Sequence, residues 1–179
     1  NDILNSELLN IIDYKYSFDQ KPINRTKTKP TLENFKTRLE ALKNKIEAIE
    51  NCNLKKNASK IVFADGDPQS SIMIVGEGPG QKEDELGKPF VGDAGNLLNK
   101  MLNAINIERN KIYITNVVNY RPPNNRKPEP SEINRYSEFL REHVSIINPK
   151  ILILMGSTAM EAILGSNKKI SKERGQWKE

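Results

Sequence analysis

The chain has 179 residues, a formal net charge of +5 and 36% hydrophobic residues, which suits one domain with a modest core and an appendage. Its basic balance allows a polyanionic partner without requiring one. No apolar run approaches the ~18 residues of a membrane span, and no basic-then-apolar signal opens the chain, so we expect a cytoplasmic protein.

The first fifty residues predict two helices and a linker. Apolar residues at helical spacing predict a short helix over residues 3–12, and a polar linker follows over residues 15–30. Thr31 can cap a second helix with one apolar stripe, which consists of Phe35, Leu39, Leu42, Ile46 and Ile49. We expect this stripe to pack on the main domain; packing on a partner is the alternative. Residues 1–48 are therefore predicted as a helical extension and linker, and residues 49–179 as the domain.

From residue 71 onward, strands alternate with helices. Continuous apolar runs predict strands over residues 71–75, 112–118 and 151–155. Three helices lie between or after them, and their expected N-caps are Asp93, Ser131 and Ser157. The middle helix extends to about residue 147, and Gly165 ends the last one. This order is typical of an α/β domain with a parallel sheet covered on both faces.

The chain has one cysteine and one histidine, which limits the disulfides, metal sites and catalytic pairs that it could form. Cys52 is the only cysteine, which excludes an intrachain disulfide and a metal site that needs two cysteines of this chain. His143 is the only histidine, so a Cys–His pair or a Ser–His–Asp triad would have to use it. We expect His143 to be a partly exposed residue in the middle of a helix.

Ligands of such sheets bind beyond the carboxyl ends of the strands, which here lead into residues 76–92, 119–130 and 156–157. The first of these loops is rich in glycine and also carries Glu77, Glu83, Asp84 and Phe90. It is not a P-loop because no Gly-Lys-Ser/Thr follows, and its spacing does not fit a dinucleotide fingerprint. A structural turn is the alternative, but a turn alone needs no such length.

The second loop follows Asn116 at the end of a strand. Its prolines favour an extended path, and Arg121, Arg126 and Lys127 are placed to meet phosphates. The alternative is a solvated basic loop without a ligand.

Together the loops form a long pattern. The run GEGPGxxEDxxGxPFVGxAGxLL is followed by ITNVVxxRPPxNRxPxxxE, by a hydrophobic strand ending in Gly156, and by the tetrapeptide RGQW from Arg174. Over residues 49–179 this resembles the family-4 uracil-DNA glycosylases. The resemblance implies a three-layer α/β/α fold with a central, mostly parallel four-stranded sheet, whose last strand is missing from this chain. It implies an enzyme of base-excision repair, with uracil-containing DNA as its partner. Separately, we expect a monomer from a bacterial source.

The resemblance also implies roles for particular residues. Phe90 stacks on a flipped-out uracil, Asn116 faces its Watson–Crick edge, and Glu77 is the catalytic residue that orients water. The segment Gly78, Pro79 and Gly80 surrounds the base, and its backbone N–H groups stabilise negative charge on the leaving uracil. Glu83 and Asp84 are supporting residues of the loop; a direct catalytic part is the alternative for Glu83. The residues expected to contact DNA are basic, namely Arg121, Arg126, Lys127 and Arg174.

One departure concerns an iron–sulfur cluster. Family members usually hold a [4Fe–4S] cluster with four cysteines. Cys52 matches the second of these, whereas Ile49, Tyr120 and Tyr136 stand at the other three positions. We therefore predict neither a cluster nor another metal cofactor, and we expect these side chains to form a small core in its place.

A second departure is the absence of a later HPS-like motif, whose histidine contacts uracil in the family. The chain ends at Glu179, before that motif would occur, so we expect the domain to be incomplete at its C-terminus. Two alternatives to an active glycosylase remain open. One is a catalytically impaired homologue that binds uracil or DNA, and the other is a domain attached to a DNA-processing protein.

Overall fold

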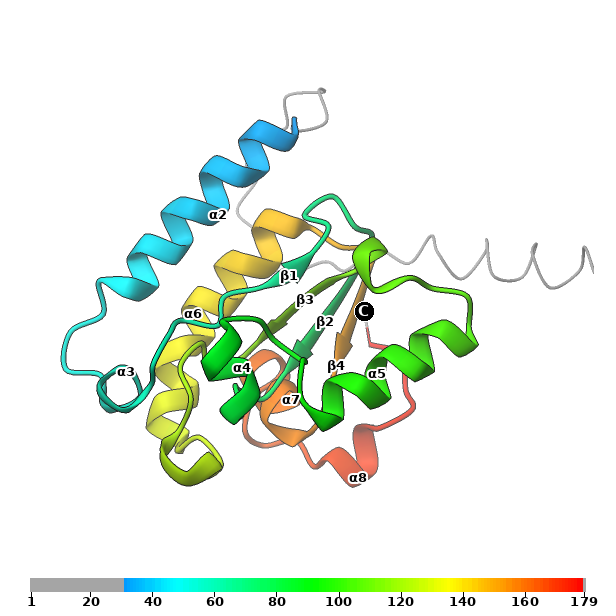
Figure 1. Cartoon of the computed structure of the whole chain (residues 1–179). Coiled ribbons are helices and arrows are strands. Elements are labelled where there is room, and N and C mark those ends of the chain that lie inside the picture. Colours follow the sequence, from blue (N-terminus) through cyan, green and yellow to red (C-terminus); the bar gives the residue numbers. More distant parts are fainter. Residues whose placement is uncertain (1–30, 179) are drawn as a thin grey trace, which may run out of the picture.

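The computed structural model describes residues 31–178, so the helix predicted over residues 3–12 and the linker over 15–30 lie outside the described residues. At its centre is a four-stranded sheet with the order β1-β3-β2-β4 (Figure 1). The parallel strands are β2 (Ile72–Gly76), β3 (Tyr113–Asn116) and β4 (Ile151–Leu154), which confirms the three predicted strands. β1 (Asp65–Gly66) runs antiparallel to β3 and was not predicted.

The parallel register brings the carboxyl ends of three strands to one edge of the sheet. Gly76 at the end of β2 lies opposite Asn116 at the end of β3, and Val75 lies opposite Leu154 of β4. The loops that follow these strands therefore start from neighbouring points, as expected for a site at the carboxyl edge.

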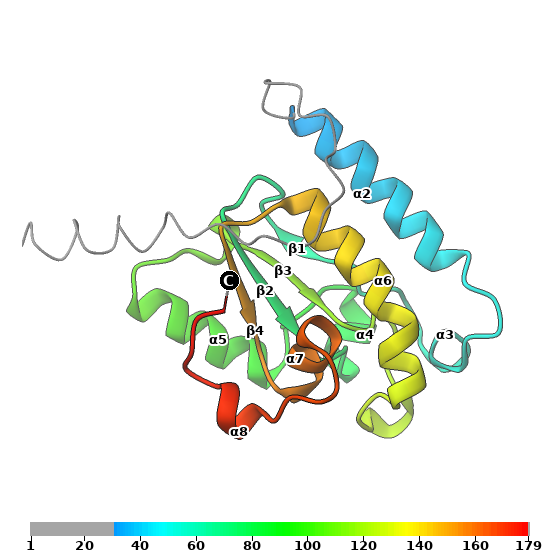
Figure 2. The ribbon, with the colours of Figure 1, turned by 180° about the vertical axis from the view of Figure 1, so that it is seen from behind.

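Helices cover both faces of this sheet (Figures 1 and 2). α2 (Leu32–Glu47) lies beside α6 (Pro130–Ile147) on one face, and α5 (Asp93–Ala104) lies on the other. Successive residues of a strand point to opposite faces. Accordingly, Met73 and Val75 enter the core shared with α2 and α6, whereas Ile74 packs with residues of α5. The apolar stripe of α2 thus packs on the domain; the boundary between residues 48 and 49 stays a prediction.

The predicted helix caps agree with the structure at some helix ends and differ at others. The Thr31 hydroxyl accepts from the Asn34 amide, as predicted. α7 (Ser157–Leu164) ends at Gly165, also as predicted, although Gly156 rather than Ser157 is its N-cap. The prediction of Ser131 as a cap was wrong, because α6 starts at Pro130 and is capped by Glu129 in a reciprocal capping box with Glu132.

For α5 the N-cap is Gly92, and Asp93 is the first helical residue. The remaining elements are short: α3 (Asn53–Asn57), α4 (Gln81–Leu86), α8 (Ile170–Glu173) and the 3₁₀ helices η1 (Arg109–Lys111) and η2 (Pro123–Asn125). α4 lies within the segment predicted as an irregular loop. Within residues 31–178, no helix is long and apolar enough to cross a membrane.

Candidate active site

Two of the predicted site residues, Phe90 and Asn116, lie against Gly76 at the end of β2. A side chain at Gly76 would begin 2.5 Å from Oδ1 of Asn116 and 2.5 Å from Cζ of Phe90. The absence of a Cβ therefore leaves the space in which the amide and the ring tip lie together. The structure thus brings Phe90 and Asn116 together above the end of β2.

Asn116 is a largely buried residue whose side-chain amide has no hydrogen-bond partner among the described residues. The residue is only 4% exposed, and no hydrogen bond among the described residues uses its side-chain amide. Neither amide atom is among the fully enclosed polar atoms that lack a partner, so the amide still reaches the surface. By contrast, the equally buried Asn119 donates its amide to the Val62 carbonyl at 3.1 Å. Asn116 is therefore arranged to pair with something outside the fold.

Phe90 holds an unusual backbone conformation. Its φ of 52° lies in the left-handed region, which costs a non-glycine residue roughly 1–2 kcal/mol. Its ring is partly exposed and packs at the edge of the small core on the α5 side. Strained backbones persist where the surrounding structure enforces them, and they concentrate at functional sites.

Glu77 directly follows Gly76 and turns its carboxylate toward α7. Thr158, a fully buried residue of the first turn of α7, donates its hydroxyl to Oε2 of Glu77 at 2.5 Å. The Glu77 backbone is fixed as well, because its carbonyl accepts from the Val118 amide at 3.2 Å. Among the described residues, no hydrogen bond reaches Oε1. One carboxylate oxygen is thus anchored and the other is left for water or substrate.

Thr158 is a site residue that sequence reasoning missed. Its place next to the N-cap of a predicted helix gave a sufficient structural reason for a threonine, so the signal was present but ambiguous.

The backbone N–H groups of Gly78 and Gly80 have no acceptor among the described residues. In the part of the chain that the structure describes, neither backbone N–H donates a hydrogen bond. Gly78 packs closely on Val118, since a Cβ there would lie 2.7 Å from Cγ2 of that valine. Pro79 between them is buried and has no N–H to offer. The two free amides are donors near Glu77 that could meet a developing negative charge.

Two of the acidic residues of α4, Glu83 and Asp84, support the loop at different places. Oε1 of Glu83 accepts from the amides of Val91 at 2.9 Å and Gly92 at 2.7 Å, beside Phe90. Asp84 is 3% exposed and accepts from the amides of Ser59 and Lys60, which ties the loop to a preceding segment. In each carboxylate these hydrogen bonds engage a single oxygen, Oε1 of Glu83 and Oδ1 of Asp84.

The basic residues predicted to contact DNA differ in whether their side chains already bind other residues of the protein. Arg126 makes a bidentate ion pair with Glu132, at 2.7 and 2.8 Å, and this hydrogen bonding lowers the pKa of the Glu132 carboxyl. Arg121 donates to Oδ1 of Asn125 at 2.7 Å. Lys127 and Arg174 are exposed. Phosphate contact by Arg126 would have to compete with its structural pair.

The positions that correspond to cluster ligands form a packed core. Ile49, Cys52, Tyr120 and Tyr136 are 8, 6, 5 and 1% exposed and belong to one hydrophobic cluster. Sγ of Cys52 lies 3.5 Å from the Tyr136 hydroxyl. Burial raises the pKa of Tyr136, and it raises that of Tyr120 to about 12, so both phenols stay protonated at neutral pH.

A [4Fe–4S] cluster needs four anionic ligands. One thiol and two neutral phenols around an isoleucine do not fit it. That the protein holds no cluster stays a prediction, whereas the packing in its place is observed.

The expectation of a partly exposed His143 was wrong. The ring is 2% exposed, stacks on Phe63 with centroids 4.7 Å apart, and lies 2.8 Å from the Tyr113 hydroxyl. Burial lowers the pKa of His143 from 6.5 to about 3, so it is neutral at physiological pH. Leu140 and Ile147 stand at i−3 and i+4 from His143, and both are buried, which places His143 on the buried face of α6.

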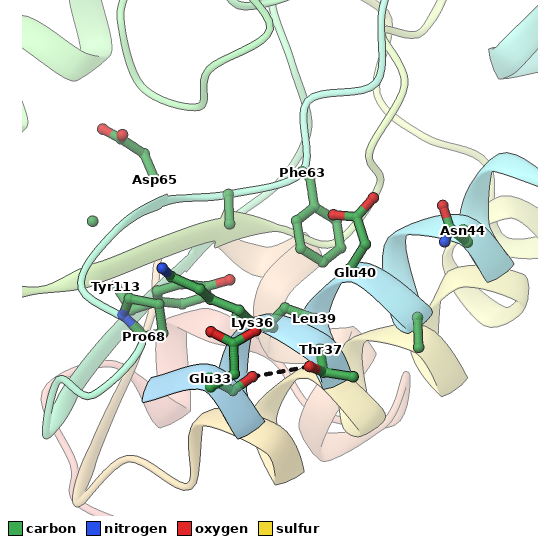
Figure 3. Close-up of a pocket in the computed structure, with 13 residues that line it drawn as sticks. Glu33, Lys36, Thr37, Leu39, Glu40, Asn44, Phe63, Asp65, Pro68 and Tyr113 are labelled. Carbon is green, nitrogen blue, oxygen red and sulfur yellow. Dashed lines mark hydrogen bonds between the residues drawn. The ribbon is translucent and has the colours of Figure 1, made fainter. Parts of the chain in front are cut away.

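A cavity among the described residues lies away from these site residues. It has a volume of about 760 Å³ and opens between α2 and the segment around β1 (Figure 3). Phe63 and Tyr113 line it, with Lys36 and Asp65 among its charged residues. None of the predicted site residues borders this cavity. Tyr113 begins β3, so this cavity does not lie at the carboxyl edge where Gly76 and Asn116 meet.

Comparison with known proteins gives a family and several relatives. Residues 63–178 match the family model of the uracil DNA glycosylase superfamily. A type-4 uracil-DNA glycosylase of Thermotoga maritima is 40% identical over 138 residues, which cover 76% of this chain and 72% of that protein. One of Sulfurisphaera tokodaii is 42% identical over 148 residues, covering 78% and 67%. A DNA polymerase of Bacillus phage SP01 is 32% identical over 124 residues, covering 69% of this chain and 13% of the polymerase.

Proposed function

Because this chain belongs to the uracil DNA glycosylase superfamily, we propose that it hydrolyses the N-glycosidic bond of a flipped-out uracil in DNA and leaves an abasic site. The observation that carries this proposal is the side-chain amide of Asn116, which has no partner among the described residues and lies with the Phe90 ring above Gly76. A flat ring beside a free amide suits a planar base with an exposed hydrogen-bonding edge. As part of the proposal, we expect a cytoplasmic monomer that acts in base-excision repair.

The Asn116 amide gives a physical basis for choosing uracil over cytosine. Its carbonyl oxygen can accept from N3–H of uracil while its nitrogen donates to O4. Cytosine reverses both groups, with an acceptor at N3 and a donor at C4. Each mispaired buried group costs on the order of 1–3 kcal/mol, so the two together can separate the bases by several orders of magnitude.

Bond cleavage requires charge stabilisation at two places. As the C1′–N1 bond breaks, its electron pair leaves with uracil, and the sugar becomes cationic. The free amides of Gly78 and Gly80 are suited to hold the uracil oxygen that takes up the negative charge. The Glu77 carboxylate, anchored by Thr158, is suited to stabilise the sugar cation and to direct a water to C1′ through its free oxygen. No amine nucleophile is needed, which is why we propose a monofunctional enzyme.

The test is a single-turnover assay of the chain on oligonucleotides that carry one uracil or one cytosine, both single-stranded and paired. We expect release of free uracil and strand breakage only after alkali treatment, since an abasic site remains. Breakage without alkali would contradict the monofunctional mechanism. Tight uracil-dependent binding without release would instead show a binding homologue.

A second candidate is the same chemistry within a larger DNA-processing assembly. The similarity to a part of a phage DNA polymerase supports it, because that match covers 13% of the polymerase and most of this chain. Uracil release by the isolated chain at the rate seen in a cell extract would count against a required partner.

A further inference from the structure

The turn that carries Phe90 is held from two sides by side chains outside the strands. Phe90 keeps a left-handed backbone with φ of 52°, a conformation that glycine would adopt without strain. An aromatic ring at such a position has to be held there by its surroundings, because its own backbone preference opposes it. The contacts of the turn show what holds it.

Arg109 in η1 binds the carbonyl side of this turn. Its Nη2 donates to the Pro89 carbonyl at 2.7 Å, and its Nη1 donates to the Phe90 carbonyl at 3.0 Å. Nη1 also reaches Oδ1 of Asn99 in α5 at 3.2 Å, and Nε pairs with Oδ2 of Asp65 at 2.9 Å. The Arg109 side chain is 22% exposed, so these contacts are largely shielded from water. One guanidinium thus connects the turn, α5 and the β1 segment.

The amide side of the same turn is fixed independently. Glu83 accepts from the amides that follow Phe90, those of Val91 and Gly92, at 2.9 and 2.7 Å. Gly95 in α5 allows close packing, since a Cβ there would lie 1.9 Å from the Phe90 carbonyl oxygen. The peptide groups before and after Phe90 are therefore held on both sides, which fixes the backbone that carries the ring above Gly76.

We propose that Arg109 is a positioning residue, which acts on substrate through Phe90 by holding its ring ready for a flipped-out uracil. This inference rests on the proposed function. The planar guanidinium can donate to two successive carbonyls, an amide oxygen and a carboxylate at once, whereas a lysine has one nitrogen and cannot span them. A ring that is ordered before the base arrives removes the cost of ordering it on binding. Arg109 lies outside the motifs that identified the other site residues.

The test is a double-mutant cycle on the full chain with Arg109→Lys and Phe90→Ala. We expect Arg109→Lys to lower kcat/KM for uracil excision about tenfold in the native background. In the Phe90→Ala background the same change should have an effect of less than twofold, because the ring through which it acts is gone. A purely structural role would lower kcat/KM by the same factor in both backgrounds, and that result would overturn the proposal.

Two matched variants separate the contacts of Arg109. Asp65→Asn removes the ion pair but leaves both carbonyl contacts, so we expect kcat/KM to change less than twofold. Gly95→Ala forces the Phe90 carbonyl away from Nη1 of Arg109 while the Arg109 side chain itself is unchanged, so it should reproduce the loss seen with Arg109→Lys. Full activity of Gly95→Ala would contradict a requirement for this geometry.

A readout without catalysis distinguishes failure of this proposal from failure of the proposed function. The five phenylalanines are replaced by 4-fluorophenylalanine, and Phe90→Leu assigns its fluorine NMR signal. Arg109→Lys should shift or broaden that signal while leaving the signals of phenylalanines distant from the turn unchanged. An unchanged Phe90 signal would overturn the positioning role. A changed signal in a protein that releases no uracil would leave the positioning role standing and reject the proposed function.

Discussion

Asn116 and Asn119 lie three residues apart and are equally buried, yet only the second uses its amide within the fold. In the sequence both stand at a strand end, where an asparagine can simply satisfy nearby backbone groups. Only the resemblance to a family distinguished Asn116, and the structure supplies the physical reason, since its amide is left without a partner among the described residues. The same holds for Glu77, which the sequence alone would present as a surface acid.

The anchoring of Glu77 by Thr158 gives a prediction at this scale. Thr158→Val keeps the shape of the side chain but removes the hydroxyl, so we expect the single-turnover rate of uracil release to fall about 10- to 100-fold, the usual worth of a hydrogen bond to a charged group. DNA affinity should change little. Thr158→Ser restores the donor and should recover most of the rate.

The control for this prediction is Glu77→Ala, which should lower the chemical step much more than binding. In that background Thr158→Val should have no further effect on the rate. If it slowed release equally in both backgrounds, Thr158 would act on something other than the carboxylate.

At the scale of elements, regular patterns were predictable and local exceptions were not. The three parallel strands and the helices between them follow from long apolar runs with clear spacing. β1 has two residues, Asp65 and Gly66, and no pattern, so nothing in the sequence identifies it. α4 was hidden in a glycine-rich segment, and the start of α6 was misplaced because Pro130 and the Glu129–Glu132 box outweigh the cap expected at Ser131. The contact between Arg109 and the Phe90 turn joins separate elements and has no local signature.

The buried core around Tyr136 gives a prediction about the stability of the fold. Tyr136→Ala should lower the free energy of unfolding by about 3–5 kcal/mol, the usual cost of deleting a large buried side chain. Tyr136→Phe removes only the weak contact with Cys52 and should cost less than about 1 kcal/mol. Urea denaturation measures both.

The native protein should be colourless and free of iron, and a stoichiometric iron content would contradict the account of this core.

For the whole molecule, the buried His143 links stability to pH. Its folded pKa of about 3 lies below its ordinary 6.5, so the unfolded chain takes up a proton first as the pH falls. Stability is therefore complete above pH 6.5 and is lost below it, by up to about 1.4 kcal/mol per pH unit.

Denaturant unfolding between pH 7.5 and 5 measures this loss. His143→Gln keeps a polar group facing Tyr113 but cannot titrate, so the slope should largely disappear over this range. An unchanged slope in this variant would show that other groups cause the pH dependence.

The central claim is that the side-chain amide of Asn116, which lies beside the Phe90 ring above Gly76, discriminates uracil from cytosine. The most direct measurement is the ratio of single-turnover excision rates on uracil and cytosine oligonucleotides, compared between the native chain and Asn116→Asp. A carboxylate cannot donate to O4 of uracil but can accept from the cytosine amine, so we expect the uracil rate to fall about 10- to 100-fold and the ratio to fall with it. An Asn116→Asp protein with the native rate and the native ratio would contradict the account.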